Sequence, residues 1–202
     1  MCVYMKSPKY LSAGQFTYIM GKLQAFEDAV FSDDGVDPKT GLHYSQIMDV
    51  ESLALKVTLE EVVKNYDANR TSQYFYKPSD DVSTLIQAGP VWDYDAAWGG
   101  YGTTASAPVL NPEGLFVVTG TSMPNSQWSS WYRALYNHSE FAEKVQQCYR
   151  ETFVHALNIL LGEETDPSGK MKSISELHNM ITASGEMDTV RWVYRPIKNN
   201  KA

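Results

Sequence analysis

The segment Gly-Pro-Val-Trp-Asp-Tyr-Asp at residues 89–95 constrains this chain most, because an apolar stretch ends there in two acidic residues one position apart. In an extended strand successive side chains alternate between faces. This predicts that Asp93 and Asp95 point to one side while Trp92 and Tyr94 point to the other. Two carboxylates on one face repel each other, so we expect a divalent cation, a basic side chain or solvent beside them. The spacing alone favours a strand that ends in a solvated acidic turn, with a metal site as the alternative.

Length and composition indicate a folded chain with an acidic surface. Its 202 residues are 43% hydrophobic, enough to bury a sizeable core, and we expect one large domain or a piece of one. The formal net charge of -7 argues against a nucleic-acid partner, because no basic stripe is present to neutralise phosphates. No apolar run is long enough for a membrane span. The first residues lack the layout of a secretory signal and read as the middle of a fold.

Hydrophobic spacing predicts several helices. A first helix begins after Ser12, where Gln15 completes a capping box, and a second begins after Asp49. A long helix is expected over about residues 140–161, and a last one begins after Ser173, again with a capping box. Together with one β-hairpin, these helices predict an α+β fold that is mostly helical.

The centre of the chain predicts the hairpin and places it near the acidic pair. Strand-like residues 73–76 are followed by a turn-forming segment at 78–83 and by a second strand that starts at Leu85 and runs to the acidic end. Strand ends remote from the turn lie on the same side of an antiparallel pair. The polar corner 67–70 and the acidic pair should therefore meet, which is the strongest functional indication from the residues alone.

Residues 99–127 are rich in Gly, Thr, Ser and Pro and are predicted to form a long loop, with residues 116–118 as one short strand. A loop of this length in a compact domain is usually functional or poorly ordered. Residues 198–202 are expected to form a frayed polar tail.

Other kinds of site are indicated less well. The four histidines are scattered without the spacing of metal ligands, and no nucleophile motif of a hydrolase is present. Several tryptophans could form a carbohydrate-stacking surface, but packing in the core is favoured. Asp93 and Asp95 do not suit a glycosidase, because two residues on one strand cannot flank a sugar ring from both faces.

Two segments carry a resemblance to a known family. They are residues 64–77, Lys-Asn-Tyr-Asp-Ala-Asn-Arg-Thr-Ser-Gln-Tyr-Phe-Tyr-Lys, and residues 89–99, Gly-Pro-Val-Trp-Asp-Tyr-Asp-Ala-Ala-Trp-Gly. Together they resemble the CotH kinase family, which is named for a bacterial spore-coat protein. Further matching positions extend from residues 6–8 to residues 191–192, so the resemblance covers nearly the whole chain. The Trp-Asp-x-Asp segment preceded by Gly-Pro is its most specific part.

The resemblance implies an atypical protein-kinase-like fold, and the chain is similar to its C-terminal lobe. It implies an enzyme that binds ATP with Mg²⁺ or Mn²⁺ and phosphorylates Ser or Thr of a secreted, coat or cell-surface protein. The parent protein would then be extracellular, on the cell surface or in the spore coat. The family's ATP-clamping lysine and phosphate-covering segment belong to an N-terminal lobe, and the sequence matches neither. We therefore expect residues 1–202 to form a single truncated domain that is inactive alone.

The resemblance also implies roles for individual residues. Asp93 matches the family's metal-binding aspartate and Asp67 its earlier active-site acid, so both are expected to be catalytic and to bind metal. Asp95 is expected to assist at the metal and the cofactor, and Asn65 and Arg70 to contact the cofactor. Carboxylates suit this chemistry, because phosphoryl transfer depends on metal ions that neutralise phosphate charge. The alternative is a non-catalytic extracellular module of the same fold that binds protein or glycan, and a structural calcium is a third hypothesis for the acidic site.

Overall fold

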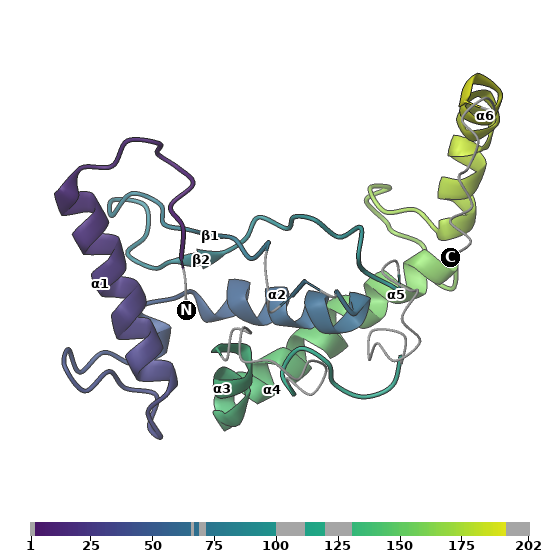
Figure 1. The fold of residues 1–202 in the computed structure, drawn as a ribbon. Coiled ribbons are helices and arrows are strands. Elements are labelled where there is room, and N and C mark those ends of the chain that lie inside the picture. The colour runs from purple at the N-terminus through teal and green to yellow at the C-terminus, as the bar shows by residue number, and fades with distance from the viewer. Residues whose placement is uncertain (1–2, 66, 69–71, 100–111, 120–130, 193–202) are drawn as a thin grey trace, which may run out of the picture. The chain divides into compact units, whose positions relative to one another are not determined.

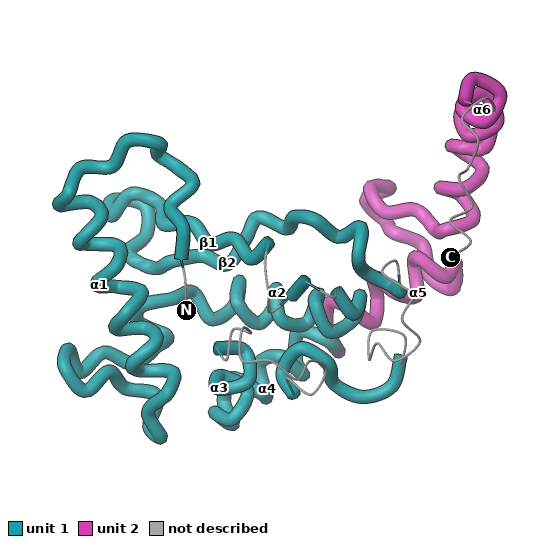
Figure 2. Tube along the Cα trace, viewed as in Figure 1, with its two compact units in different colours: residues 1–149 teal, residues 150–202 magenta. Residues whose placement is uncertain are grey.

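A computed structural model describes residues 3–65, 67–68, 72–99, 112–119 and 131–192 (Figure 1). The chain divides into two compact units, residues 1–149 and 150–202 (Figure 2). The first unit holds α1 (Ala13–Val30), the 3-10 helix η1 (Tyr44–Gln46), α2 (Val50–Val63), β1 (Phe75–Tyr76), β2 (Gln87–Ala88), α3 (Trp131–Asn137) and α4 (Ser139–Cys148). The π-helical turn η3 (Tyr149–Phe153) crosses the boundary, and α5 (Val154–Leu161) and α6 (Ile174–Trp192) follow. The predicted α+β, mostly helical class is confirmed.

The first two long helices begin where the sequence predicts. At α1, the Gln15 backbone N–H donates to the Ser12 hydroxyl at 3.2 Å, and the Ser12 N–H donates to Gln15 Oε1 at 3.0 Å. At α2, the Ser52 N–H donates to Asp49 Oδ1 at 2.7 Å. These contacts satisfy N–H groups that a helix leaves unpaired in its first turn, so both caps follow from local sequence.

Helix α2 lies at the centre of the first unit. Its residues Leu53, Ala54 and Val57 are at most 1% exposed, and the helix packs against α4 and against β2. Figure 1 shows the helix running beside the β1–β2 hairpin. Burial of one large aliphatic side chain contributes about 1.5–3 kcal/mol, so this packing supplies much of the unit's stability. Because α2 is enclosed on several sides, some of its charged side chains are buried as well.

Glu61 is one of these buried charges, and it holds a distant loop against α2. Its two oxygens accept the backbone N–H groups of residues 116–118 at 2.7, 2.8 and 2.9 Å. The Lys64 ammonium lies 3.8 Å from the same carboxylate. Three consecutive amides directed at one carboxylate cannot also form a strand ladder. The predicted short strand at 116–118 is therefore wrong: these residues form a buried turn.

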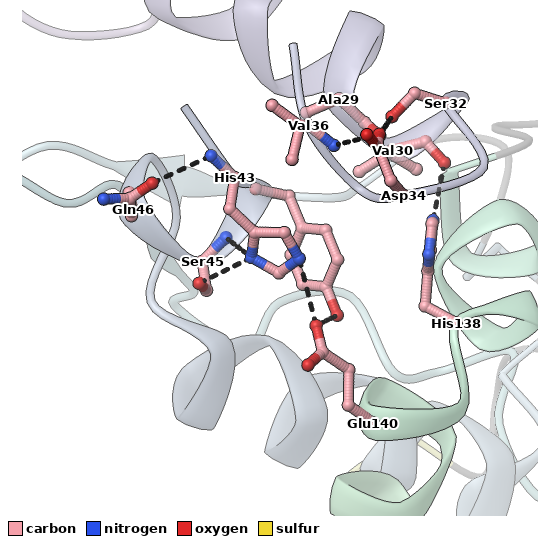
Figure 3. A network of polar contacts seen from close by, with 11 residues as sticks. Ala29, Val30, Ser32, Asp34, Val36, His43, Ser45, Gln46, His138 and Glu140 are labelled. Atoms are coloured by element: carbon pink, nitrogen blue, oxygen red, sulfur yellow. Dashed lines mark hydrogen bonds and ion pairs between the residues drawn. The ribbon is translucent and has the colours of Figure 1, made fainter. Parts of the chain in front are cut away.

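A second polar network joins the end of α1 to η1 and α4 (Figure 3). The Tyr44 hydroxyl donates to Glu140 Oε1 at 2.6 Å, and His43 Nε2 lies 3.1 Å from the same oxygen. His138 Nε2 lies 2.9 Å from the Val30 carbonyl oxygen. Burial raises the pKa of the Tyr44 hydroxyl, and the adjacent Glu140 carboxylate adds to this, so Tyr44 stays neutral and donates. These contacts fix the turn-rich segment between α1 and α2.

The predicted hairpin is present, although its strands are shorter than expected. β1 and β2 are antiparallel, with Phe75 opposite Ala88. The Gly89 N–H still donates to the Tyr74 carbonyl at 2.8 Å, but Gly89 has φ 133° and Pro90 has no N–H to continue the ladder. The second strand therefore ends before the acidic pair.

The helices after residue 137 agree with prediction in part. The predicted helix over residues 140–161 is interrupted by η3, and α4 already begins at Ser139. Before α6, the Ser173 N–H donates to Glu176 Oε2 at 2.8 Å and the Glu176 N–H donates to Ser173 Oγ at 3.2 Å, which confirms this capping box. In the described part of the chain no helix combines the length and apolar character needed to cross a membrane. The tail and most of the loop 99–127 lie outside the described residues.

Glu61→Gln should lower the free energy of unfolding by about 2–3 kcal/mol, because the side chain loses its charge and presents an NH₂ donor to amides that need an acceptor. Denaturant unfolding followed by circular dichroism measures this loss. Glu51→Gln is the matched control: it lies on the same helix with its side chain 56% exposed, and its surface ion pair with Lys144 contributes about 0–1 kcal/mol. Equal losses in the two variants would contradict the role assigned to Glu61.

Candidate functional site

The acidic pair lies in a loop and not at the end of a strand. Asp93 has φ 65°, in the left-handed region, and Asp95 begins a run of turns over residues 95–99. A left-handed residue redirects the chain, so the alternation of an extended strand does not hold here. Trp92 is 58% exposed, whereas the Tyr94 side chain is half-buried and contacts α2. The prediction that Trp92 and Tyr94 point the same way, on a strand that carries both acids, is wrong.

The hairpin nevertheless brings the acidic loop against the segment that holds the other candidates. The Ser72 hydroxyl donates to Asp93 Oδ2 at 2.8 Å. The Trp98 N–H donates to the Val63 carbonyl at 2.7 Å, so the far end of the loop returns to the last turn of α2. Val63 and Ser72, which flank three of the predicted site residues in the sequence, are therefore both bound to the acidic loop.

Asn65 and Asp67 form a turn directly after α2. Asn65 is fully buried; its Oδ1 accepts the Asp67 N–H at 3.2 Å, and its carbonyl accepts the Ala68 N–H at 3.1 Å. Among the described residues, Asn65 Nδ2 has no hydrogen-bond partner, and a buried donor of this kind calls for a water or a ligand. Asp67 is half-buried. Arg70 lies outside the described residues, and a cation shared by Asp67 and Asp93 stays a prediction.

The sequence patterns did not lead us to a buried ion pair beside this loop. Lys56 Nζ lies 2.5 Å from Glu60 Oε1, with side chains 3% and 0% exposed. The Tyr94 hydroxyl accepts from Lys56 Nζ at 2.9 Å and donates to Glu60 Oε1 at 2.8 Å. Gln73 Nε2 lies 3.5 Å from the same Glu60 oxygen, and the Tyr132 hydroxyl donates to Gln73 Oε1 at 2.6 Å. The available signal was a pair of opposite charges one helical turn apart inside an apolar helix.

The two tyrosines of this network are held neutral. Burial raises the pKa of the Tyr94 hydroxyl well above its ordinary value, and the Glu60 carboxylate raises it further. Burial also raises the pKa of Tyr132, again with a contribution from the charge of Glu60. Both hydroxyl protons are therefore available for hydrogen bonds to Glu60 and to Gln73 across the neutral pH range.

The exposed carboxylates have the chemistry of ligands for a hard cation. Asp93 and Asp95 are both exposed, and neither is ion-paired with a lysine or arginine of the described segments. The same segments contain no group of three or more His, Cys, Asp or Glu side chains placed to hold a metal ion. Mg²⁺ is usually bound by one or two carboxylates together with water and phosphate oxygens. Asp93 and Asp95 are carboxylates of the kind that such an ion takes as ligands.

A cavity of about 410 Å³ lies in the second unit. Its lining is mainly apolar and includes two lysines; the residues are Leu160, Lys170, Met171, Lys172, Leu177 and Met180. None of the candidates for metal or nucleotide binding belongs to this lining.

A comparison with models of known protein families matches residues 4–200 to the family described as CotH kinase protein. The chain belongs to the CotH kinase family. The resemblance carried by residues 64–77 and 89–99 is thereby confirmed, and it extends over nearly the whole chain. Searches among curated proteins and among solved structures found no match.

The stability of this CotH kinase chain should fall as pH rises above about 10. A tyrosine whose folded-state pKa is raised above its unfolded value binds its proton more tightly in the folded state. Its contribution is therefore complete below the unfolded pKa and is lost as pH rises toward the folded pKa. Urea unfolding between about pH 8 and about pH 11 measures the slope, to which each tyrosine adds up to about 1.4 kcal/mol per pH unit.

Tyr94→Phe and Tyr132→Phe should each reduce this slope. Tyr76→Phe is the control, because it removes the hydroxyl of a tyrosine that is 53% exposed. The same slope in all four proteins would show that neither buried hydroxyl is linked to folding.

Proposed function

We propose that this chain forms the metal- and nucleotide-binding part of a protein Ser/Thr kinase, with the C-terminal lobe of a kinase-like fold. Its membership of the CotH kinase family supports this proposal. The observation that carries it is the Ser72–Asp93 hydrogen bond of 2.8 Å, because it joins the acidic loop to the segment of Asn65 and Asp67. The two parts of the sequence with the strongest family resemblance thus meet at one place.

In this proposal Asp93 and Asp95 hold Mg²⁺ or Mn²⁺, and Asp67 binds the cation or accepts the proton of the substrate hydroxyl. A cation held by these carboxylates would supply the neutralisation of phosphate-oxygen charge on which phosphoryl transfer mainly depends. Ser72 restricts the Asp93 carboxylate by donating to one of its oxygens. A carboxylate that is already oriented loses less freedom when it binds a ligand.

The remaining candidates are assigned to the nucleotide. The Nδ2 donor of Asn65, which has no partner among the described residues, suits a phosphate oxygen or a water bound to it. Arg70 would pair with a phosphate by virtue of its guanidinium group. The substrate would be a Ser or Thr of a secreted, coat or cell-surface protein. The alternative is a non-catalytic extracellular module of the same family that binds protein or glycan.

Mn²⁺ and ATP together should stabilise the chain more than either does alone. At a free ligand concentration of about 100 times Kd, the stabilisation is about 2.7 kcal/mol, which raises the melting temperature by several degrees. Asp93→Asn should abolish most of this increase, because it removes a charged ligand of the cation. Thermal unfolding with Mn²⁺, ATP, both or neither measures the effect.

Asp33→Asn is the matched control, since Asp33 is also an exposed aspartate of the first unit. It should respond to Mn²⁺ and ATP as the unaltered chain does. A chain that responds to neither ligand, with Asp93→Asn indistinguishable from it, would contradict the kinase proposal and favour the binding module. Stabilisation by Ca²⁺ alone, indifferent to nucleotide, would instead indicate a structural calcium site.

A further inference from the structure

We propose that the buried Lys56–Glu60 pair is a positioning device for the acidic loop and that it acts through the Tyr94 hydroxyl. The purpose of the device, orienting Asp93 for a cation, rests on the function proposed above. The contacts that define it are independent of any ligand. None of these three residues is a candidate to touch metal, nucleotide or substrate, so each acts through its neighbours.

Stability alone is a poor reason to bury these two charges. Removing a lysine and a glutamate from water carries a desolvation cost that their mutual attraction often fails to exceed, and apolar side chains frequently serve equally well. Lys56 and Glu60 are nevertheless 3% and 0% exposed at their side chains. Their shared partner is Tyr94, the residue between Asp93 and Asp95. The pair is therefore bound to the residue that lies between the two acids in the sequence.

The contacts around Glu60 close into a ring. Tyr94 and Gln73 both reach Glu60 Oε1, at 2.8 and 3.5 Å. Their chain neighbours, Asp93 and Ser72, are joined by the hydrogen bond of 2.8 Å. One oxygen of a single buried carboxylate thus anchors both segments that meet at Asp93. The other oxygen, Oε2, has no hydrogen-bond partner within the described residues. Among those residues, the polar contacts of this carboxylate are therefore with Tyr94, Gln73 and Lys56.

The backbone at Asp93 explains why such an anchor is needed. Asp93 has φ 65°, a left-handed conformation that costs free energy for a residue other than glycine and persists where the surroundings enforce it. Tyr94, one residue further on, is fixed at its hydroxyl by two charged groups. The Asp93 side chain itself accepts a hydrogen bond from the Ser72 hydroxyl. Without the Tyr94 anchor, the loop between residues 93 and 98 is free to relax from this conformation.

Tyr94→Phe tests the device because it keeps the aromatic ring of the side chain and removes only the hydroxyl. Amide hydrogen exchange, measured by NMR without metal, should be about fivefold to tenfold faster at Ala97 and Trp98, whose N–H groups donate to the Tyr94 and Val63 carbonyls at 3.1 and 2.7 Å. Tyr44→Phe is the matched control, since it also removes a buried hydroxyl that donates to a glutamate, Glu140. It should leave the exchange rates of Ala97 and Trp98 unchanged.

Titration of the same three proteins with Mn²⁺ supplies the second measurement. Tyr94→Phe should weaken Mn²⁺ binding about fivefold, and Tyr44→Phe should not change it. Unchanged exchange at Ala97 and Trp98 in Tyr94→Phe would overturn the positioning role, whether or not Mn²⁺ binds. Faster exchange in Tyr94→Phe, with Mn²⁺ affinity equal to that of the unaltered chain, would overturn the claim that the device orients Asp93 for the cation. If the unaltered chain takes up no Mn²⁺, the kinase proposal fails and the exchange rates alone decide whether Tyr94 holds the loop.

Discussion

The first unit depends on the burial of charged side chains along α2. Lys56, Glu60 and Glu61 are each at most 8% exposed, and a charge removed from water is tolerated only when other groups replace its hydration. Two of them neutralise each other, and Glu61 takes three backbone amides from the loop at 116–118. This requirement determines where the loops lie. Distant parts of the sequence supply the polar groups that contact the charges of α2, and the loops that carry these groups are bound there.

The elements that could be predicted are those set by neighbours in sequence. Ser12 and Asp49 cap helices through contacts with the residue three positions on, and the hairpin follows from two strand-like segments beside a turn-forming one. The resemblance of residues 64–77 and 89–99 to one family likewise depended only on the order of residues, and the family match over residues 4–200 agrees with it. The proposed roles of Asp67 and Asp93 still rest mainly on that resemblance.

What could not be predicted depends on partners far along the chain. Tyr94 turns toward residues 34 and 38 positions away, and Glu61 receives amides 55 to 57 positions away. A period-two pattern assumes an extended backbone, and it fails at Asp93 because the positive φ there ends the alternation. For residues 116–118, strand propensity was outweighed by a carboxylate that needed donors. At both places the structure brings a buried charge of α2 into contact with the segment or its chain neighbour.

The separation between buried and exposed charge also organises the candidate site. A carboxylate that is buried and paired, such as Glu60, holds a fixed geometry but has lost the access that ligand binding requires. Asp93 and Asp95 keep that access because they are exposed, and exposed loop residues lack a geometry of their own. Tyr94, between them in sequence, is half-buried and connects the two kinds of environment. An acidic loop whose carboxylates stay exposed to ligand can therefore be ordered through a half-buried neighbour that contacts buried charges, to which the ligand has no access.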